Sequence, residues 1–167
     1  MTELSWIQPY LAIGPRPTIQ SAWPTWIVLQ KEGLRLIIDL NDDPTEKRQA
    51  DRFGLGYKGV KVPDPTEPED FLVTFPPITQ WIEDERKADG RVYLHCTAGM
   101  SRSPTCAMAY LMTTGKTREE ARNLVRNVHG PAWTSGDIET LERALALWEK
   151  QLSRSHRFPD GREAPCF

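Results

Sequence analysis

The residues with the clearest chemical potential form one run of eleven, HCTAGMSRSPT, from His95 to Thr105. Within it, five residues separate Cys96 from Arg102. A loop of this kind, ending against a helix, lets successive backbone N–H groups converge on an anion such as the three equatorial oxygens of a phosphoryl group. The cysteine sulfur can then attack the phosphorus atom, so the run predicts nucleophilic substitution at phosphorus.

The residue types around Cys96 favour this chemistry. Gly99 lets the backbone bend tightly, and Pro104 fits the first turn of a helix, where its missing N–H costs nothing. The positive end of that helix and the Arg102 guanidinium both favour the thiolate form of a nearby cysteine. We therefore expect Cys96 to be a thiolate nucleophile at neutral pH and Arg102 to bind two phosphoryl oxygens with its planar fork.

The other residues of the run are expected to support the reaction. Ser103 is placed to donate a hydrogen bond to the sulfur as it leaves phosphorus, and His95 to hold the loop through backbone carbonyls. The loop itself provides the expected substrate-binding residues: Thr97, Ala98, Gly99, Met100, Ser101 and Arg102.

A general acid is needed because an alkoxide leaves phosphorus poorly without a proton. The segment 62–70 follows an expected strand and carries four carboxylates among three prolines. Asp64 comes directly after that strand and is the predicted acid, with Asp70 as the alternative. The same carboxylate would then act as a base and activate water in the second half of the reaction.

Short apolar runs indicate the strands that position these residues. The runs 34–40, 57–62 and 91–95 read as buried strands, and the last leads into Cys96. Residues 6–14 are expected to add short edge strands. Helical patterns alternate with these runs, which predicts an α/β fold with a central, mainly parallel twisted sheet flanked by helices.

Capping residues and apolar periodicity predict the helices. They are expected after Asp43, over 77–88, over 103–114, after Thr117 and from about residue 134. The segment 103–114 is apolar on almost all sides, so it is expected to be the buried central helix.

The run from His95 to Thr105 resembles the signature H-C-x-A-G-x-S-R-S-x-T of the dual-specificity phosphatases, in the cysteine-dependent protein tyrosine phosphatase superfamily. Every fixed position is matched, and the likeness covers residues 5 to 152. Cys-x5-Arg alone also occurs in sulfurtransferases and arsenate reductases, so the resemblance rests on the match at all fixed positions of the signature. It implies a protein tyrosine phosphatase-like fold, a cysteinyl-phosphate intermediate, no metal or other cofactor, and inhibition by phosphate-like oxyanions. It also places the family's acid aspartate at Asp64.

The variable loop positions bear on the substrate. Thr97, Ala98 and Met100 are uncharged. Members of the superfamily that act on inositol lipids follow a different pattern, with lysines at these loop positions. Phosphotyrosine and phosphoserine/threonine in proteins are therefore the expected substrates. A phosphoglucan or another small phosphoester is the alternative. A non-catalytic phosphoprotein-binding module is a reading of another class, but such modules lack the cysteine, arginine or acid that this chain keeps.

Composition sets further limits. The 167 residues suit one catalytic domain over 1–152 and a loosely held tail over 153–167. A net charge of -2 and a pI of 5.9 argue against a nucleic-acid partner, and the apolar runs are too short for a membrane span. Cys96, Cys106 and Cys166 lack the spacing of a zinc site or a disulfide framework, which favours a reducing, cytoplasmic location.

Four residues receive other assignments. Cys106 is expected to be a buried structural thiol, Asp39 a structural carboxylate at a strand end, and His129 a helix C-terminal residue rather than a ligand. Trp133 either lines the pocket mouth or covers the core. The segment 129–133 lacks the asparagine that often orders the site in the family.

Overall fold

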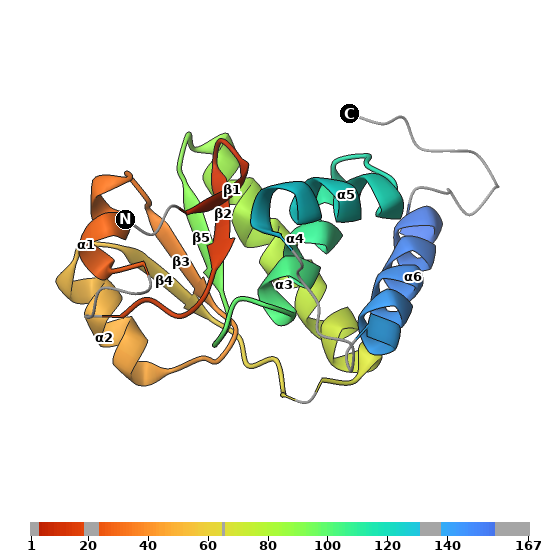
Figure 1. Cartoon of the computed structure of the whole chain (residues 1–167), viewed down its shortest axis with the longest axis horizontal. Coiled ribbons are helices and arrows are strands. Elements are labelled where there is room, and N and C mark those ends of the chain that lie inside the picture. Colours follow the sequence, from red (N-terminus) through yellow and green to blue (C-terminus); the bar gives the residue numbers. More distant parts are fainter. Residues whose placement is uncertain (1–3, 19–23, 65, 131–137, 156–167) are drawn as a thin grey trace.

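The computed structural model describes residues 4–18, 24–64, 66–130 and 138–155, and Figure 1 shows its arrangement. The strands are β1 (Ser5–Gln8), β2 (Leu11–Gly14), β3 (Leu36–Asp39), β4 (Gly56–Gly59) and β5 (Val92–His95). The helices are α1 (Trp26–Lys31), α2 (Pro44–Arg52), α3 (Pro68–Lys87), α4 (Arg102–Thr113), α5 (Arg118–His129) and α6 (Ile138–Ser155).

The five strands form one sheet in the order β1-β2-β5-β3-β4. Only the β1–β2 pair is antiparallel, so the expected α/β fold with a mainly parallel sheet is confirmed. Gly14 of β2 and Asp39 of β3 both pair with His95 of the central strand β5. The carboxyl ends of three parallel strands therefore meet where Cys96 begins, at the edge where α/β folds bind ligands.

Helices cover both faces of the sheet (Figure 1). Because side chains alternate along a strand, Val92 and Leu94 of β5 pack with α3, α4, α5 and α6, whereas Tyr93 packs with α1 and α2. The helix α4 is the buried centre of the larger layer, as predicted, and contacts β2, β5, α3, α5 and α6. Its N-terminus is thereby fixed behind the loop that leaves β5.

The predicted N-cap at Asp43 of α2 and the predicted capping box of α5 are confirmed, whereas Glu46 of α2 pairs with Arg16 and His95 instead of completing a capping box. The Thr45 N–H donates to the Asp43 carboxylate over 2.8 Å, and this bond is the main cause that lowers the pKa of Asp43. At α5, Thr117 and Glu120 form a reciprocal capping box. Both helices flank the site, so these local signals help to position it.

The helix α3 begins at Pro68, nine residues before the predicted start at Pro77. The sequence-based boundary is wrong because Pro76 and Pro77 lie inside the helix rather than at its beginning. Each proline removes a helical hydrogen bond. Fully buried apolar side chains on both sides of the prolines offset this loss, and they form one stripe on α3: Phe71, Phe75, Ile78 and Ile82.

Other boundaries also differ from expectation. The strand expected over 57–62 ends at Gly59, and β2 is internal, so only β1 is an edge strand within the segment 6–14. The short helix α1 carries no long periodic pattern and was not predicted. The helix α6 is described from Ile138 and runs to Ser155, three residues into the expected tail.

Several sequence-based expectations fall outside the part of the chain that the structure describes. They are the start of the last helix near residue 134, Trp133, Cys166 and the remainder of the tail. Among the described helices, none combines the length and hydropathy that a membrane span requires.

Candidate active site

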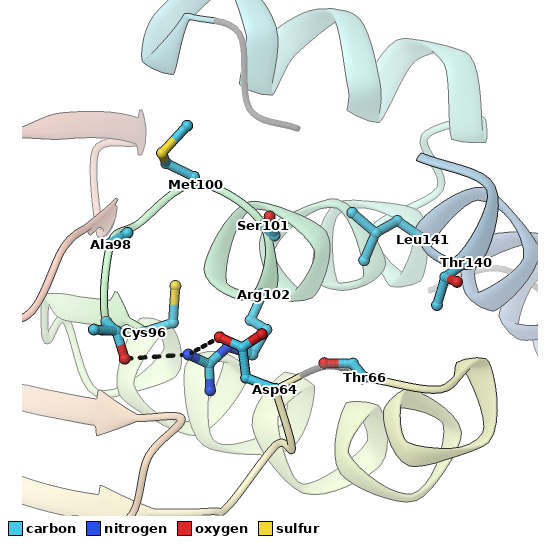
Figure 2. A pocket seen from close by; sticks show the side chains of 10 residues that line it. Asp64, Thr66, Cys96, Ala98, Met100, Ser101, Arg102, Thr140 and Leu141 are labelled. Atoms are coloured by element: carbon cyan, nitrogen blue, oxygen red, sulfur yellow. Dashed lines mark hydrogen bonds and ion pairs between the residues drawn. The ribbon is translucent and has the colours of Figure 1, made fainter. Parts of the chain in front are cut away.

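The loop between β5 and α4 curves around a cavity of about 250 Å³ (Figure 2). The cavity is lined by Asp64, Thr66, Cys96, Thr97, Ala98, Met100, Ser101, Arg102, Thr140 and Leu141. Figure 2 shows the Cys96 sulfur on the inner side of the curve, between the loop and the side chains of Arg102 and Asp64. The structure thus gathers the predicted nucleophile, guanidinium and acid around one space.

The residue Cys96 is almost fully buried in the loop, with 3% exposure. Its sulfur lies 3.5 Å from the Ser103 hydroxyl on the first turn of α4. The same hydroxyl lies 3.4 Å from the Gly14 carbonyl at the end of β2, which can only accept. When Cys96 is a thiolate, both neighbours can only accept, and the Ser103 hydroxyl can donate its proton to the sulfur.

Arg102 is anchored from two sides by its terminal nitrogens. Nη1 donates to the Val62 carbonyl (2.9 Å) and to Asn41 Oδ1 (3.3 Å). Nη2 donates to Thr97 Oγ1 (3.2 Å) and forms an ion pair with Asp64 Oδ2 (3.0 Å). Figure 2 draws the contacts on the Nη2 side. The Asp64 carboxylate thus occupies a place beside the guanidinium that an oxygen of another anion could take.

The two candidate acids occupy different places. Asp64 lies at the rim of the cavity with 71% of its side chain exposed. Asp70 lies in the first turn of α3, where its carboxylate accepts the Glu67 N–H over 3.0 Å as half of a capping box. Asp70 is not among the residues that line the cavity, so the geometry favours Asp64.

A buried charged cluster lies beneath the loop. His95 is fully buried, with Nδ1 3.2 Å from the Cys96 carbonyl and Nε2 2.9 Å from Glu46 Oε2. The other oxygen of Glu46 pairs with Arg16 Nε at 2.5 Å, and the Arg16 backbone N–H donates to the Thr97 carbonyl. His95 therefore contacts the loop through a carbonyl, while Glu46 connects it to α2.

Asp39, Glu46 and His95 also bring three potential metal ligands within 4.8 Å of one another. Glu46 is paired with Arg16 and His95. Asp39 accepts the backbone N–H groups of Asn41 and Asp43 and the Tyr57 hydroxyl. Protein cations and donors already occupy these oxygens, so the cluster fits a structural role better than a metal site.

Sequence reasoning missed two contributions to the site. Asn41 follows β3 and accepts from Thr97 Oγ1 (3.0 Å) and Arg102, while its amide donates to Asp39. The cavity wall formed by Thr140 and Leu141 comes from α6, far along the chain. The one sequence signal for Asn41 was its position just after the carboxyl end of β3, which lies beside β5.

Cys106 does not belong to the cavity. It lies fully buried on α4, and desolvation by burial raises the pKa of its thiol well above the ordinary value. The described cysteines thus occupy contrasting environments: Cys96 opens on the cavity, and Cys106 is enclosed in the core.

The family model described as the dual specificity phosphatase catalytic domain matches residues 20–142, well over half of the chain. The chain belongs to the dual specificity phosphatase family. Dual specificity protein phosphatase Mpk3 of Drosophila melanogaster is 32% identical over 100 residues, which cover 59% of this chain and 24% of that protein. Dual specificity protein phosphatase 1 of Homo sapiens is 38% identical over 71 residues, covering 42% and 19%. The chain thus matches a quarter or less of the length of these relatives.

Solved structures share the fold at lower identity. Tk-PTP in its active form has a TM-score of 0.72 and 22% identity, with 90% of this chain and 98% of that chain covered. Human DUSP28 has a TM-score of 0.70 and 22% identity, covering 89% and 97%. A mouse putative dual specificity phosphatase complexed with zinc tungstate has a TM-score of 0.68 and 21% identity, covering 89% and 87%.

Proposed function

We propose that this chain is a cysteine-dependent phosphatase that hydrolyses phosphomonoesters through a cysteinyl-phosphate intermediate. One observation carries the proposal: the Cys96 sulfur lies inside a loop between β5 and the N-terminus of α4, with Arg102 beside the same cavity. Backbone amides, the helix end and a guanidinium all favour a phosphoryl group there.

In the first half-reaction, the Arg102 guanidinium exchanges Asp64 for oxygens of the bound phosphoryl group. The Cys96 sulfur attacks phosphorus from the side opposite the ester oxygen, so an S–P bond forms as the P–O bond breaks. The leaving oxygen takes a proton from Asp64, which stands at the rim of the cavity. The phosphoryl charge shifts in the transition state, where the planar fork of Arg102 can bind more tightly.

In the second half-reaction, water replaces the alcohol. The Asp64 carboxylate accepts a proton from the water, whose oxygen attacks phosphorus as the S–P bond breaks. Inorganic phosphate is released, and the hydroxyl of Ser103, 3.5 Å from the sulfur, stabilises the departing thiolate. Each step uses groups of the chain itself, with water as the second substrate.

Phosphoproteins are the proposed substrates, with phosphotyrosine and phosphoserine/threonine as the reacting groups. The family membership and the names of the matched relatives support a protein substrate. Arg102 is the one cationic residue among those that line the described cavity, which suits a phosphomonoester with a single phosphoryl group. The mouse relative complexed with tungstate supports inhibition by phosphate-like oxyanions.

We also propose a reducing compartment, the cytoplasm, as the working location. The described cysteines, Cys96 and Cys106, are both free. A catalytic thiolate needs such surroundings because oxidation would remove the nucleophile.

Turnover of para-nitrophenyl phosphate by the purified chain tests the function. We expect hydrolysis that orthovanadate inhibits and that the Cys96→Ser variant lacks. Equal turnover by the wild type and Cys96→Ser, or none by either, would refute the proposal. Phosphopeptides with phosphotyrosine or phosphoserine, assayed beside a phosphorylated glucan, then separate protein substrates from the carbohydrate alternative.

A further inference from the structure

The imidazole of His129, the last residue of α5, joins two distant segments at the crest of the loop. Its Nε2 lies 2.7 Å from the Gly99 carbonyl oxygen, and its Nδ1 lies 2.7 Å from the Ser5 hydroxyl on β1. These distances lie at the short end of the range for hydrogen bonds. His129 therefore connects α5 and β1 to the middle of the phosphate-binding loop.

The chemistry of the partners determines the donor and acceptor roles in this bridge. A carbonyl oxygen can only accept, so Nε2 must carry the proton that bonds Gly99. In the neutral imidazole Nδ1 is then an acceptor, and the Ser5 hydroxyl can donate to it. Ser5 thus keeps the ring in the tautomer and orientation that Gly99 requires.

Fixing the Gly99 carbonyl also fixes the next amide. The peptide group between Gly99 and Met100 is planar and trans, so its N–H points opposite to its C=O. The carbonyl points to α5, which lies above the loop in Figure 2, while the Cys96 sulfur lies beneath the crest. The Met100 N–H is therefore directed toward the side where the sulfur and the cavity lie.

The crest is also confined from its other side. Gly99 has a φ of 74°, and a Cβ placed on it would come within 2.5 Å of the Gly14 carbonyl carbon and the Pro15 nitrogen. Within the described residues, the backbone N–H groups of Ala98, Gly99 and Met100 donate to no protein acceptor. These amides are available to an anion in the cavity that Ala98 and Met100 line.

We infer that His129 is a positioning residue for the proposed phosphatase reaction: it holds the Gly99–Met100 peptide so that the Met100 amide binds a phosphoryl oxygen. The inference rests on the proposed function. A helix C-terminal histidine with only a structural role would contribute to folding stability alone. If His129 also positions the loop, oxyanion binding and turnover depend in addition on the N–H donor at position 129.

Two variants of similar size separate these roles. His129→Gln keeps an N–H donor at about the reach of Nε2, whereas His129→Met fills the site without one. Val128→Ala, at the exposed neighbouring residue of α5, is the control. The measurements are kcat and KM for para-nitrophenyl phosphate, the inhibition constant of orthovanadate, and the unfolding temperature with and without orthovanadate. The kinetic and inhibition constants are measured at a temperature below the lowest unfolding midpoint of the variants.

We expect His129→Met to lower kcat about 10- to 100-fold and to raise the orthovanadate inhibition constant at least about tenfold, because one oxyanion donor is misdirected. His129→Gln should recover most of both losses, and Val128→Ala should match the wild type. If His129→Met kept both constants within about twofold of the wild type, or if Gln and Met lost activity equally, the inference would be wrong. A wild type without orthovanadate-sensitive turnover would instead refute the proposed function itself.

Discussion

At the residue scale, the planar guanidinium of Arg102 lets its two terminal nitrogens contact different sets of partners. Each terminal nitrogen contacts two partners: Nη1 meets Val62 and Asn41, and Nη2 meets Thr97 and Asp64. One set therefore holds the guanidinium in place while the other faces the cavity. A point charge on a flexible stem cannot keep both sets at once.

Arg102→Lys should accordingly be severely impaired although the positive charge is kept. We expect kcat/KM for para-nitrophenyl phosphate to fall by at least about 100-fold, because the two-pronged contact in the transition state is lost. Steady-state kinetics measures the change. Activity near the wild-type value would contradict the assigned loop geometry.

Asp64→Asn should slow the hydrolysis of alkyl phosphates more than that of aryl phosphates. A phenolate leaves phosphorus with less help from an acid than an alkoxide does. The matched control is Asp70→Asn, which keeps an oxygen to accept the Glu67 N–H and should leave both rates unchanged. Equal losses on both substrates with Asp64→Asn would move the acid role to another residue.

The described cysteines should differ in reactivity. Burial raises the pKa of Cys106, so its thiol stays neutral and unreactive at neutral pH. Iodoacetate should therefore alkylate Cys96 first, and inorganic phosphate should protect it, as peptide mapping of a Cys166→Ser variant can show. Faster labelling at Cys106, or no protection by phosphate, would be inconsistent with the site.

At the element scale, the site depends on the meeting of β2, β3 and β5 and on a charged contact from α2. Glu46, in the first turn of α2, has 5% exposure and pairs with both Arg16 and His95. His95 in turn contacts the Cys96 carbonyl. The helix therefore affects the loop without touching the cavity.

Glu46→Gln should lower the free energy of unfolding by about 1–3 kcal/mol, because the new amide N–H₂ group would face either Arg16 or His95, each of which is itself a donor. It should also lower kcat through the displaced His95. Glu149→Gln, at a partly exposed pair with Arg118, is the control and should change stability by less than about 0.5 kcal/mol. Chemical denaturation and kinetics measure both effects. Identical behaviour of the two variants would show that the buried cluster does not support the loop.

Local patterns were sufficient to predict the strand–loop–helix around Cys96, because apolar runs, a loop glycine and helix caps act over a few residues. They were insufficient for α3, where tertiary burial of Phe71 and Phe75 offsets two prolines. Asn41 and His129 contact the loop across 56 and 30 residues of chain, and such contacts leave no periodic trace in the sequence. The candidate nucleophile and the contact of His95 with the loop were therefore predictable, whereas the contacts of Asn41 and His129 with the loop were not.

At the scale of the whole molecule, the fold brings three distant segments to one edge of the sheet. The loop carries Cys96 and Arg102, the segment after β4 carries Asp64, and α6 supplies Thr140 and Leu141. The two helical layers pack on opposite faces of the sheet (Figure 1). The proposed catalytic groups and the wall of their cavity thus come from separate elements that only the complete fold places together.

The central claim is that the Cys96 sulfur forms a bond to phosphorus, and mass spectrometry of an acid-quenched reaction tests it most directly. Para-nitrophenyl phosphate is mixed with the wild type, with Asp64→Asn and with Cys96→Ser, and the peptides are mapped. We expect one phosphoryl group on Cys96 in the first two proteins and none in the third. Release of phosphate by the wild type with no adduct on Cys96 at any quench time, or continued turnover by Cys96→Ser, would contradict the account.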